Sequence, residues 1–209
     1  MIHPSTQVQF ISDGLGHGVV ATSFIPKGTI TWVQDPLDRV FSPEEFHLLP
    51  ITAQSLLEYF AFRNARGEMI LCWDHARFVN HSFRSNCLST AYDFEIAIRD
   101  IHVGEQLTDD YGYLNLDLPW RPADEGTRRK WVRPDDVIRY SKEWDRSLMA
   151  ALRKSNRVEQ PLAQWITHQT LGEIKDVCQG KSSMRSISEL YWNNGNYNNL
   201  APQSLFIDK

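Results

Sequence analysis

The chain has 209 residues, 42% hydrophobic and 11% aromatic, which suits one large globular domain or a domain with a helical extension. Its longest apolar runs are only a few residues, too short to span a bilayer. Three well-separated cysteines, Cys72, Cys87 and Cys178, argue against a disulfide framework and favour a reducing compartment. The first residues show no basic segment followed by a long apolar run, so we expect no secretory signal and an intracellular protein, cytoplasmic or nuclear.

Charge is divided unevenly along the chain, although the formal net charge is only −4. Residues 1–120 hold 7 Lys and Arg against 15 Asp and Glu, whereas residues 121–157 hold 11 against 6. An acidic front part attracts a cationic partner and repels nucleic acid. We assign the basic segment to the solvated faces of helices, and we expect no direct nucleic-acid binding.

Short strands joined by turns are predicted at the start of the chain. Apolar and polar residues alternate there, β-branched and aromatic residues follow, and Asp13-Gly14 and Pro26-Lys27-Gly28 supply turns. The expected strands cover residues 8–11, 19–24 and 29–33.

A helical insert is predicted next, over about residues 42–65. Ser42-Pro43-Glu44-Glu45 combines a capping residue, a proline in the first turn and acidic residues at the positive end of the helix dipole. The helical signal resumes over 53–62. Further β-type segments follow, of which the second and third form a hairpin. They cover residues 69–73, 88–92, 94–98 and 107–111.

The pattern changes after Pro119. Residues 120–134 are charged and irregular, whereas 135–154 and 160–178 have apolar residues at three- and four-residue spacing, which predicts two helices. A polar tail follows, with a short apolar island at 190–192. The sequence therefore predicts an α+β, β-rich body over residues 1–118 and a helical extension over 119–209.

A glycine-rich loop, DGLGHGV at residues 13–19, has three glycines at every second position. Such spacing suits a backbone that approaches a ligand or takes positive φ. The dinucleotide fingerprint requires G-x-G-x-x-G between a strand and a helix, and a P-loop requires Gly-Lys-Ser/Thr. Neither is present, and taken alone the loop fits a plain hairpin turn equally well.

Two further stretches combine polar chemistry with strand-like residues. FVNHSFRSNC at 78–87 is apolar at its start and then crowded with Asn, His, Ser and Cys. AIRDIHVGEQLTDDYGY at 97–113 is a strand, a glycine turn and a second strand that ends on Tyr111 and Tyr113. A tyrosine hydroxyl at a strand end can orient a ligand, although taken alone a core tyrosine is the plainer interpretation.

Together and in this order, the three stretches resemble the SET-domain family of protein lysine methyltransferases, over about residues 6–118. The resemblance extends to small bacterial-type members through Trp73-Asp74, Leu114-Asn115-Leu116 and RYSKEWD at 139–145. It implies a β-clip-like body of short curved sheets. It also implies methyl transfer from S-adenosylmethionine to a lysine ε-amine of a basic protein or peptide. The two ligands would enter from opposite faces.

The resemblance assigns residues to the cofactor. Leu15, Gly16 and His17 would lie along it, mostly through backbone atoms, and the glycines would keep Cβ atoms away from the ligand. Asn80 and His81 would bind its amino-acid and adenine ends, with His81 acting largely through its backbone.

The resemblance also assigns the reacting centre. Tyr111 would be the catalytic tyrosine at the point of methyl transfer, and Tyr113 would line the lysine channel. A sulfonium is already a good leaving group, so the site needs alignment and a neutral amine rather than a metal or a covalent nucleophile. A lysine, with a pKa of about 10.4, is mostly charged at pH 7, and a dry channel beside a cation lowers that pKa.

The sequence departs from the family pattern in two places. Many relatives carry a zinc-binding, cysteine-rich segment after the tyrosines, but residues 118–129 contain no cysteine. We therefore expect no metal there, and we expect Trp120 or Trp131 to cover the adenine. Asp109 stands where relatives often have an aromatic residue that influences the degree of methylation. We place Asp109 near the substrate channel with its carboxylate turned to solvent, and the degree of methylation stays open.

Three alternatives remain. The spacing of Cys72, His75, His81 and Cys87 is not a common zinc pattern, although each ligand type is suitable. Cys87 or Ser82 could act as a nucleophile with His81 as its base, but sequence neighbours point apart. The third alternative is a SET fold that binds peptide or cofactor without catalysis. The substrate stays open, as does dimer formation through the C-terminal helices.

Overall fold

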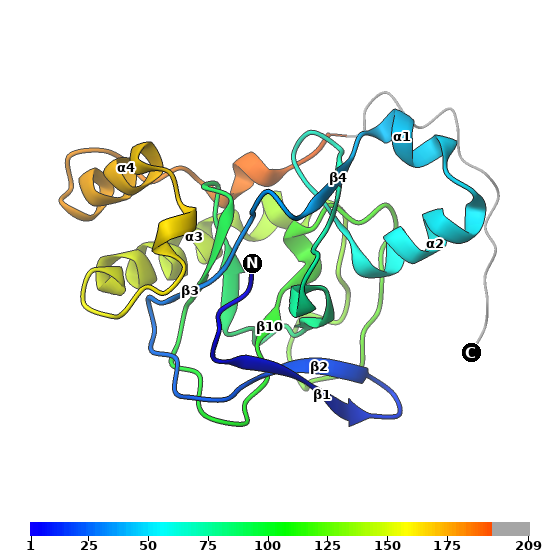
Figure 1. The fold of residues 1–209 in the computed structure, drawn as a ribbon, viewed down its shortest axis with the longest axis horizontal. Helices are drawn as coiled ribbons and strands as arrows, with labels where there is room; N and C mark the ends of the chain where they lie inside the picture. The colour runs from blue at the N-terminus through cyan, green and yellow to red at the C-terminus, as the bar shows by residue number, and fades with distance from the viewer. Residues whose placement is uncertain (194–209) are drawn as a thin grey trace.

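The computed structural model describes residues 1–193 of the chain. Its body consists of short strands in several small sheets, with the long helix α3 and helix α4 packed along one side (Figure 1). The fold is therefore mixed α+β, as the sequence predicts. The end of the predicted polar tail, residues 194–209, lies outside the described residues.

The strands are short, and β1 with its seven residues is the longest of those described in residues 1–193. They are β1 (Thr6–Ser12), β2 (Gly16–Ala21), β3 (Ile30–Val33), β4 (Arg39–Phe41), β5 (Phe62–Arg63), β6 (Met69–Leu71), β7 (Asn80–His81), β8 (Cys87–Ser89), β9 (Phe94–Ala97) and β10 (Thr108–Asp109).

The helices fall into an insert between β4 and β5 and an extension after the body (Figure 1). The α-helices are α1 (Pro43–Leu48), α2 (Ile51–Phe60), α3 (Asp136–Ser155) and α4 (His168–Cys178). Short 3-10 helices are η1 (His75–Phe78), η2 (Tyr111–Tyr113), η3 (Ala163–Trp165) and η4 (Ile187–Leu190).

Most strand pairs are antiparallel. β1 pairs with β2, β9 lies between β3 and β8, and β6 lies between β4 and β5. β7 and β10 pair in parallel instead, with Asn80 opposite Thr108 and His81 opposite Asp109. This pair brings the NHS and DDYGY stretches side by side, although they are far apart in the sequence.

The predicted helix start at Ser42 is confirmed. Its hydroxyl accepts a hydrogen bond from the Glu45 backbone N–H, and the Glu45 carboxylate accepts one from the Ser42 N–H, which completes a capping box. The predicted helix over 160–178 is confirmed only for its second part. Thr167 caps α4 by accepting from the Thr170 N–H, so a new helix begins there.

The helical extension shares its core with the strand body. Leu88 and Ile96 on β8 and β9 are fully buried in one cluster with Leu148 and Leu152 of α3 and Ile187 of η4. Burial of such side chains stabilises by about 1.5–3 kcal/mol each. The extension therefore contributes directly to the stability of the sheet that it covers.

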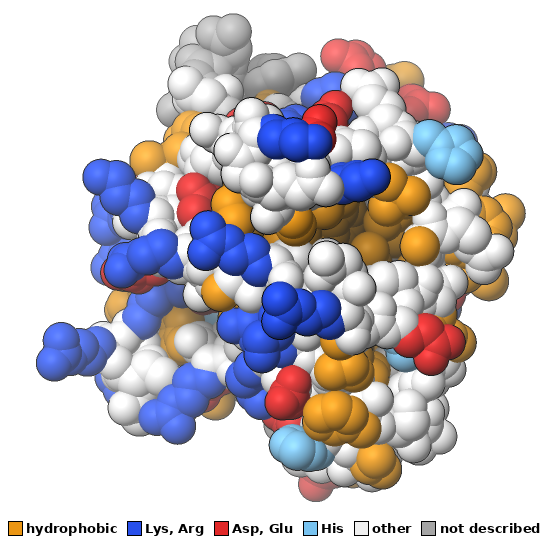
Figure 2. Space-filling view, turned by 90° about the vertical axis from the view of Figure 1, so that its left-hand side faces the viewer, with side chains coloured by type: hydrophobic (Ala, Val, Ile, Leu, Met, Phe, Trp, Pro, Cys, Tyr) orange, Lys and Arg blue, Asp and Glu red, His pale blue; other side chains and the backbone are white. Residues whose placement is uncertain are grey.

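The outer side of α3 is basic. Arg139, Lys142, Arg146 and Arg153 are exposed on it, and Figure 2 shows Lys and Arg side chains gathered on this side of the molecule. This matches the predicted solvated helix face. Within residues 1–193, none of the helices has the length and hydropathy that a membrane crossing requires.

Candidate functional site

The glycine-rich loop is the turn of the β1–β2 hairpin. Gly16 has a φ of +71°, in the left-handed region that favours glycine, and Leu15 beside it is half exposed at 49%. Gly18 has a different role. A Cβ there would lie 2.7 Å from Nδ2 of Asn80 and 2.6 Å from Oε1 of Gln106. The expectation that every glycine makes space for a ligand is thus wrong for Gly18, which makes space for the Asn80 amide.

Asn80 links the hairpin to β7. Its Nδ2 donates to the His17 carbonyl oxygen at 3.1 Å and to Oε1 of Gln106 at 3.1 Å. These contacts fix the loop against the NHS stretch. The His17 ring packs against Phe10 at 5.8 Å and Phe78 at 6.3 Å between ring centroids.

The His81 side chain makes a contact of its own with Tyr111, in addition to any contact that the His81 backbone makes. Its Nδ1 accepts a hydrogen bond from the Tyr111 backbone N–H at 3.1 Å. Burial, reinforced by the nearby positive charge of Arg129, lowers the pKa of His81 to about 4, although a hydrogen bond with the Asp109 backbone opposes this shift. The ring is therefore neutral at physiological pH. Its Nε2 is buried and has no partner among the described residues.

Tyr111 lies where these elements meet. Its hydroxyl donates to the Val79 carbonyl oxygen at 2.7 Å, and burial raises its pKa. Its ring is stacked on Trp120, with centroids 5.9 Å apart and planes at 27°, and Trp120 also packs edge-on against His81 at 5.4 Å. Trp131 instead lies near the Arg121 guanidinium, 6.0 Å away. Of the two tryptophans, Trp120 is the one at the site.

A segment after η2 is pinned against the site by Arg129. This side chain forms ion pairs with Asp110 and, at 2.6 Å, with Asp136. Its guanidinium also lies over the rings of Phe83 at 4.7 Å and Tyr140 at 4.5 Å. We call these five residues the Arg129 cluster.

A second link joins this segment to the stretch after β7. The carboxylate of Glu125 accepts hydrogen bonds from the Ser82 hydroxyl at 3.1 Å and the Phe83 backbone N–H at 3.0 Å. Together with the Arg129 cluster, this contact holds Trp120 and its flanking residues beside Tyr111 without any cysteine.

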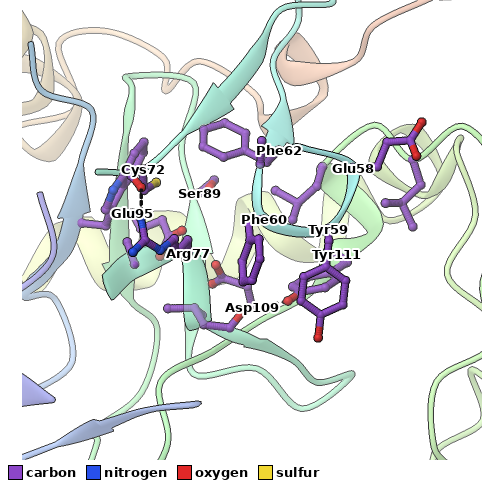
Figure 3. A pocket seen from close by; sticks show the side chains of 16 residues that line it. Glu58, Tyr59, Phe60, Phe62, Cys72, Arg77, Ser89, Glu95, Asp109 and Tyr111 are labelled. Carbon is purple, nitrogen blue, oxygen red and sulfur yellow. Dashed lines mark hydrogen bonds between the residues drawn. The ribbon is translucent and has the colours of Figure 1, made fainter. Parts of the chain in front are cut away.

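Tyr111 also lines a pocket with a void of about 130 Å³ (Figure 3). Its mouth is near the end of α2, where Glu58 and Tyr59 are exposed, and Asp109 at its inner end is only 5% exposed. The walls combine aromatic and aliphatic residues, and acidic residues outnumber Arg77, the one cation among the lining residues. The aromatic residues are Trp32, Tyr59, Phe60, Phe62 and Tyr111, and the acidic ones are Glu58, Glu95 and Asp109.

Asp109 does not turn to solvent, and that expectation is wrong. The β7–β10 pairing buries its carboxylate and directs it to the pocket. Glu95, which the sequence interpretation missed, lines the same pocket from β9. The sequence does contain a signal for Glu95. It is an acidic residue between Phe94 and Ile96, in a strand whose other side chains are apolar. Tyr113 is fully buried, is not among the lining residues, and packs edge-on against Trp144.

A comparison with family models matches residues 16–112 to the SET domain. Residues 16–112 are a SET domain. The matched range includes the glycine loop from Gly16 onward, β7 and Tyr111, and it ends before the segment pinned by Arg129. No curated protein matches the chain at a significant level.

The SET domain does not form the metal site considered above. Within residues 1–193, the one group of three potential ligands that converges is Cys87, Glu95 and Asp109, with ligand atoms within 4.8 Å of one another. Cys72, His75 and His81 are not part of it. The thiol pKa values of Cys72 and Cys87 are raised well above the ordinary range by burial.

The alternative of a nucleophile with His81 as its base is also not formed. The Ser82 hydroxyl donates to Glu125, the Cys87 thiol to Oδ1 of Asn86, and the His81 ring accepts from Tyr111. Each group is thus engaged elsewhere. The SET domain instead offers a neutral imidazole, a buried tyrosine hydroxyl and an acidic pocket.

Proposed function

We propose that this SET domain transfers a methyl group from S-adenosylmethionine to the ε-amine of a lysine in a protein substrate. One observation carries the proposal. Tyr111 belongs both to the group formed by His17, Asn80, His81 and Trp120 and to the aromatic, acidic pocket. If each group of residues binds one ligand, Tyr111 lies where the two ligands would meet. Methyl transfer between them requires such an arrangement.

The first group fits the cofactor. The buried Nε2 of His81 lacks a partner among the described residues, and Trp120, 42% exposed, offers a flat aromatic surface beside it. An adenine ring supplies a stacking face and polar edge atoms that match both features. Asn80, His81, Trp120 and the backbone near Gly16 would hold it. When bound, S-adenosylmethionine supplies a methyl group on a sulfonium sulfur.

The pocket fits the side chain of lysine. Its aromatic walls suit an alkyl chain that ends in a cation, and its carboxylates attract that cation. Tyr111, fixed by Val79, would align the amine with the methyl group. The excess of acidic residues in the first 120 positions favours a basic protein or peptide as the partner.

Two further assignments form part of the proposal. Residues 1–118 act as the catalytic body, and residues 119–134 cover the cofactor without zinc. The Arg129 cluster supports the second assignment, since it supplies the attachment that bound zinc supplies in many relatives. Dimer formation through α3 and α4 stays a prediction.

The test uses the full chain, radiolabelled S-adenosylmethionine and a mixture of lysine-rich proteins. We expect label in protein that resists removal by hydroxylamine and that amino-acid analysis recovers as methyl-lysine. Calorimetry run in parallel measures cofactor affinity. Cofactor binding without transfer to any protein would favour a binding module, and absence of cofactor binding would contradict the proposal altogether.

A further inference from the structure

Two carboxyl groups face each other at the inner end of the pocket. The side-chain oxygens of Glu95 and Asp109 and the Cys87 sulfur lie within 4.8 Å of one another, and both acidic residues line the void. They come from neighbouring parts of the body, β9 and β10. Each is held by strand pairing rather than by a mobile loop. The arrangement is therefore built into the fold.

Neither carboxyl group takes part in an ion pair within residues 1–193, although Arg77 lines the same pocket. Oδ1 of Asp109 is buried and makes no hydrogen bond of normal geometry with any described residue, and neither does the Tyr113 hydroxyl that faces it. Burial raises the pKa of Asp109 and raises that of Glu95 well above its ordinary range, with the charge of Asp109 adding to the rise for Glu95. Two acids so placed share one proton and keep about one negative charge.

We propose that the Glu95–Asp109 pair binds the ammonium group of the substrate lysine and takes its proton, which leaves the neutral amine for methyl transfer. This inference rests on the proposed function and assigns the proton acceptor within it. The void lets an ammonium group approach Asp109 with the butyl chain along Tyr59, Phe60 and Tyr111. The aromatic channel would contact the alkyl chain of such a side chain, and the carboxylate oxygen at its end would accept a hydrogen bond from the ammonium group.

The proton balance is simple. One N–H bond of the ammonium breaks, its hydrogen joins a carboxylate oxygen of the pair, and its electrons stay on nitrogen as a lone pair. That lone pair forms the N–C bond to the methyl group, while the methyl–sulfur bond breaks with its electrons on sulfur. The pair returns its proton to water after the product leaves. The transfer exchanges an ion pair for two neutral partners, which a dry pocket favours.

The groups around the pair do not compete for this role. Burial raises the pKa values of Cys72, Cys87, Tyr111 and Tyr113, so all four stay protonated near neutral pH. Of the remaining charged groups, Arg77 also lines the pocket, and each has another partner or is exposed. Asp110 is paired with Arg129, Arg77 donates to the Cys72 carbonyl oxygen, the amino terminus is paired with Asp35, and Glu58 is exposed at the mouth.

A bound metal ion is the competing use of the same atoms. We favour the ammonium because Cys87 is fully buried and does not line the void, so the void reaches only the two carboxyl groups of the set. Two carboxylates alone are fewer ligands than a protein metal site ordinarily supplies. An ammonium group needs only the oxygens, which the void reaches directly.

The experiment compares methyl transfer by the wild-type chain, Asp109→Asn and Glu95→Gln from pH 6.5 to 10. Both substitutions keep the side-chain shape and remove only the ionisable oxygen. We expect kcat at pH 7.5 to fall about 100-fold in each variant, the size of a lost proton acceptor. Near pH 10 the kcat/KM of the variants should recover to within several-fold of wild type, because the neutral fraction of free lysine is roughly 200 times larger there than at pH 7.5. Glu143→Gln, which removes an exposed carboxylate of α3, is the control and should follow the wild-type profile.

Several outcomes separate this inference from the function on which it rests. Variants that match wild-type kcat at pH 7.5 would overturn it while leaving methyl transfer intact. Variants that lose activity equally at every pH, with cofactor affinity unchanged, would overturn it in favour of a purely structural role. One bound metal ion per wild-type chain, lost in Asp109→Asn, would overturn it in favour of a metal site. A wild-type chain without any transfer would instead contradict the proposed function.

Discussion

The Tyr111 hydroxyl donates a hydrogen bond to the Val79 carbonyl oxygen at 2.7 Å. Val79 is the residue directly before β7. The tyrosine expected at the reacting centre is thus fixed by the backbone of the strand that carries Asn80 and His81. Tyr111→Phe removes this bond and leaves the ring in place. We expect kcat to fall at least about 100-fold. The measurement is methyl transfer under saturating substrate.

Cofactor affinity is the control for Tyr111→Phe. Because the stacking of the ring on Trp120 does not involve the hydroxyl, calorimetry should give a Kd for S-adenosylmethionine close to that of wild type. A variant that keeps its full kcat would exclude Tyr111 from the reacting centre.

In the proposed cofactor site, Trp120 would contribute a stacking face. Trp120→Ala should weaken binding of S-adenosylmethionine by about 3–10-fold, the range expected for one aromatic contact. The matched control is Trp131→Ala, because Trp131 is exposed to the same degree, 41% against 42%, but lies near Arg121 instead. Equal losses of affinity in both variants would show that Trp120 acts through the fold of the segment and not through the ligand.

Arg129 is the anchor of the covering segment. Lysine in its place cannot reach Asp110 and Asp136 together or spread a planar cation over Phe83 and Tyr140. Arg129→Lys should lower the free energy of unfolding by about 3 kcal/mol, because it leaves buried carboxylates without a full partner. Urea denaturation measures this loss.

Arg128→Lys is the control for that measurement, since Arg128 is its exposed neighbour. The control should change stability by less than about 0.5 kcal/mol. A similar loss in both variants would point to the backbone of the segment rather than to the ion pairs of the Arg129 cluster.

His81 makes stability depend on pH. Its pKa is about 4 in the folded chain, below the ordinary value of 6.5, because burial and Arg129 disfavour the charged ring. Between these two values the unfolded chain binds a proton that the folded chain does not, so stability is present above pH 6.5 and falls toward pH 4. Replacement by glutamine removes this loss.

Unfolding free energies at pH 7.5 and pH 5.0 test the assignment. The decrease between the two should be about 1–2 kcal/mol smaller in His81→Gln than in wild type. His3, whose pKa is also lowered by burial, contributes equally to both proteins and cancels from the comparison. An identical decrease in the two proteins would mean that His81 is charged in the folded state.

Local patterns in the sequence were sufficient for α1, α3 and the β8–β9 hairpin, but for only the second part of the helix expected over 160–178. Ser42 with Glu45 marked the start of α1, and the apolar spacing over 135–154 marked α3 almost to the residue. The resemblance brought together the segments of His81 and Tyr111, which lie in contact in the structure. These features depend on residues close in sequence or on a motif with fixed spacing.

The inner end of the pocket depends on long-range placement and was missed. Glu95 and Asp109 meet only because β9 and β10 converge, whereas the local sequence around Asp109 favours a carboxylate that faces solvent. The same holds for Arg129. Its segment reads as a charged surface, and only the folded chain shows that Asp110 and Asp136 converge on it. Charge patterning identifies the sign of the charge on a segment, but not how deeply its side chains are buried.

The parallel β7–β10 pair joins the two sites of the proposed function. Asn80 and His81 would contact the cofactor, and Asp109, which stands opposite His81, lines the pocket. A ligand that shifts β7 would therefore also shift β10, so we expect binding at the two sites to be coupled. Such coupling is reciprocal, since each ligand must change the affinity for the other by the same factor.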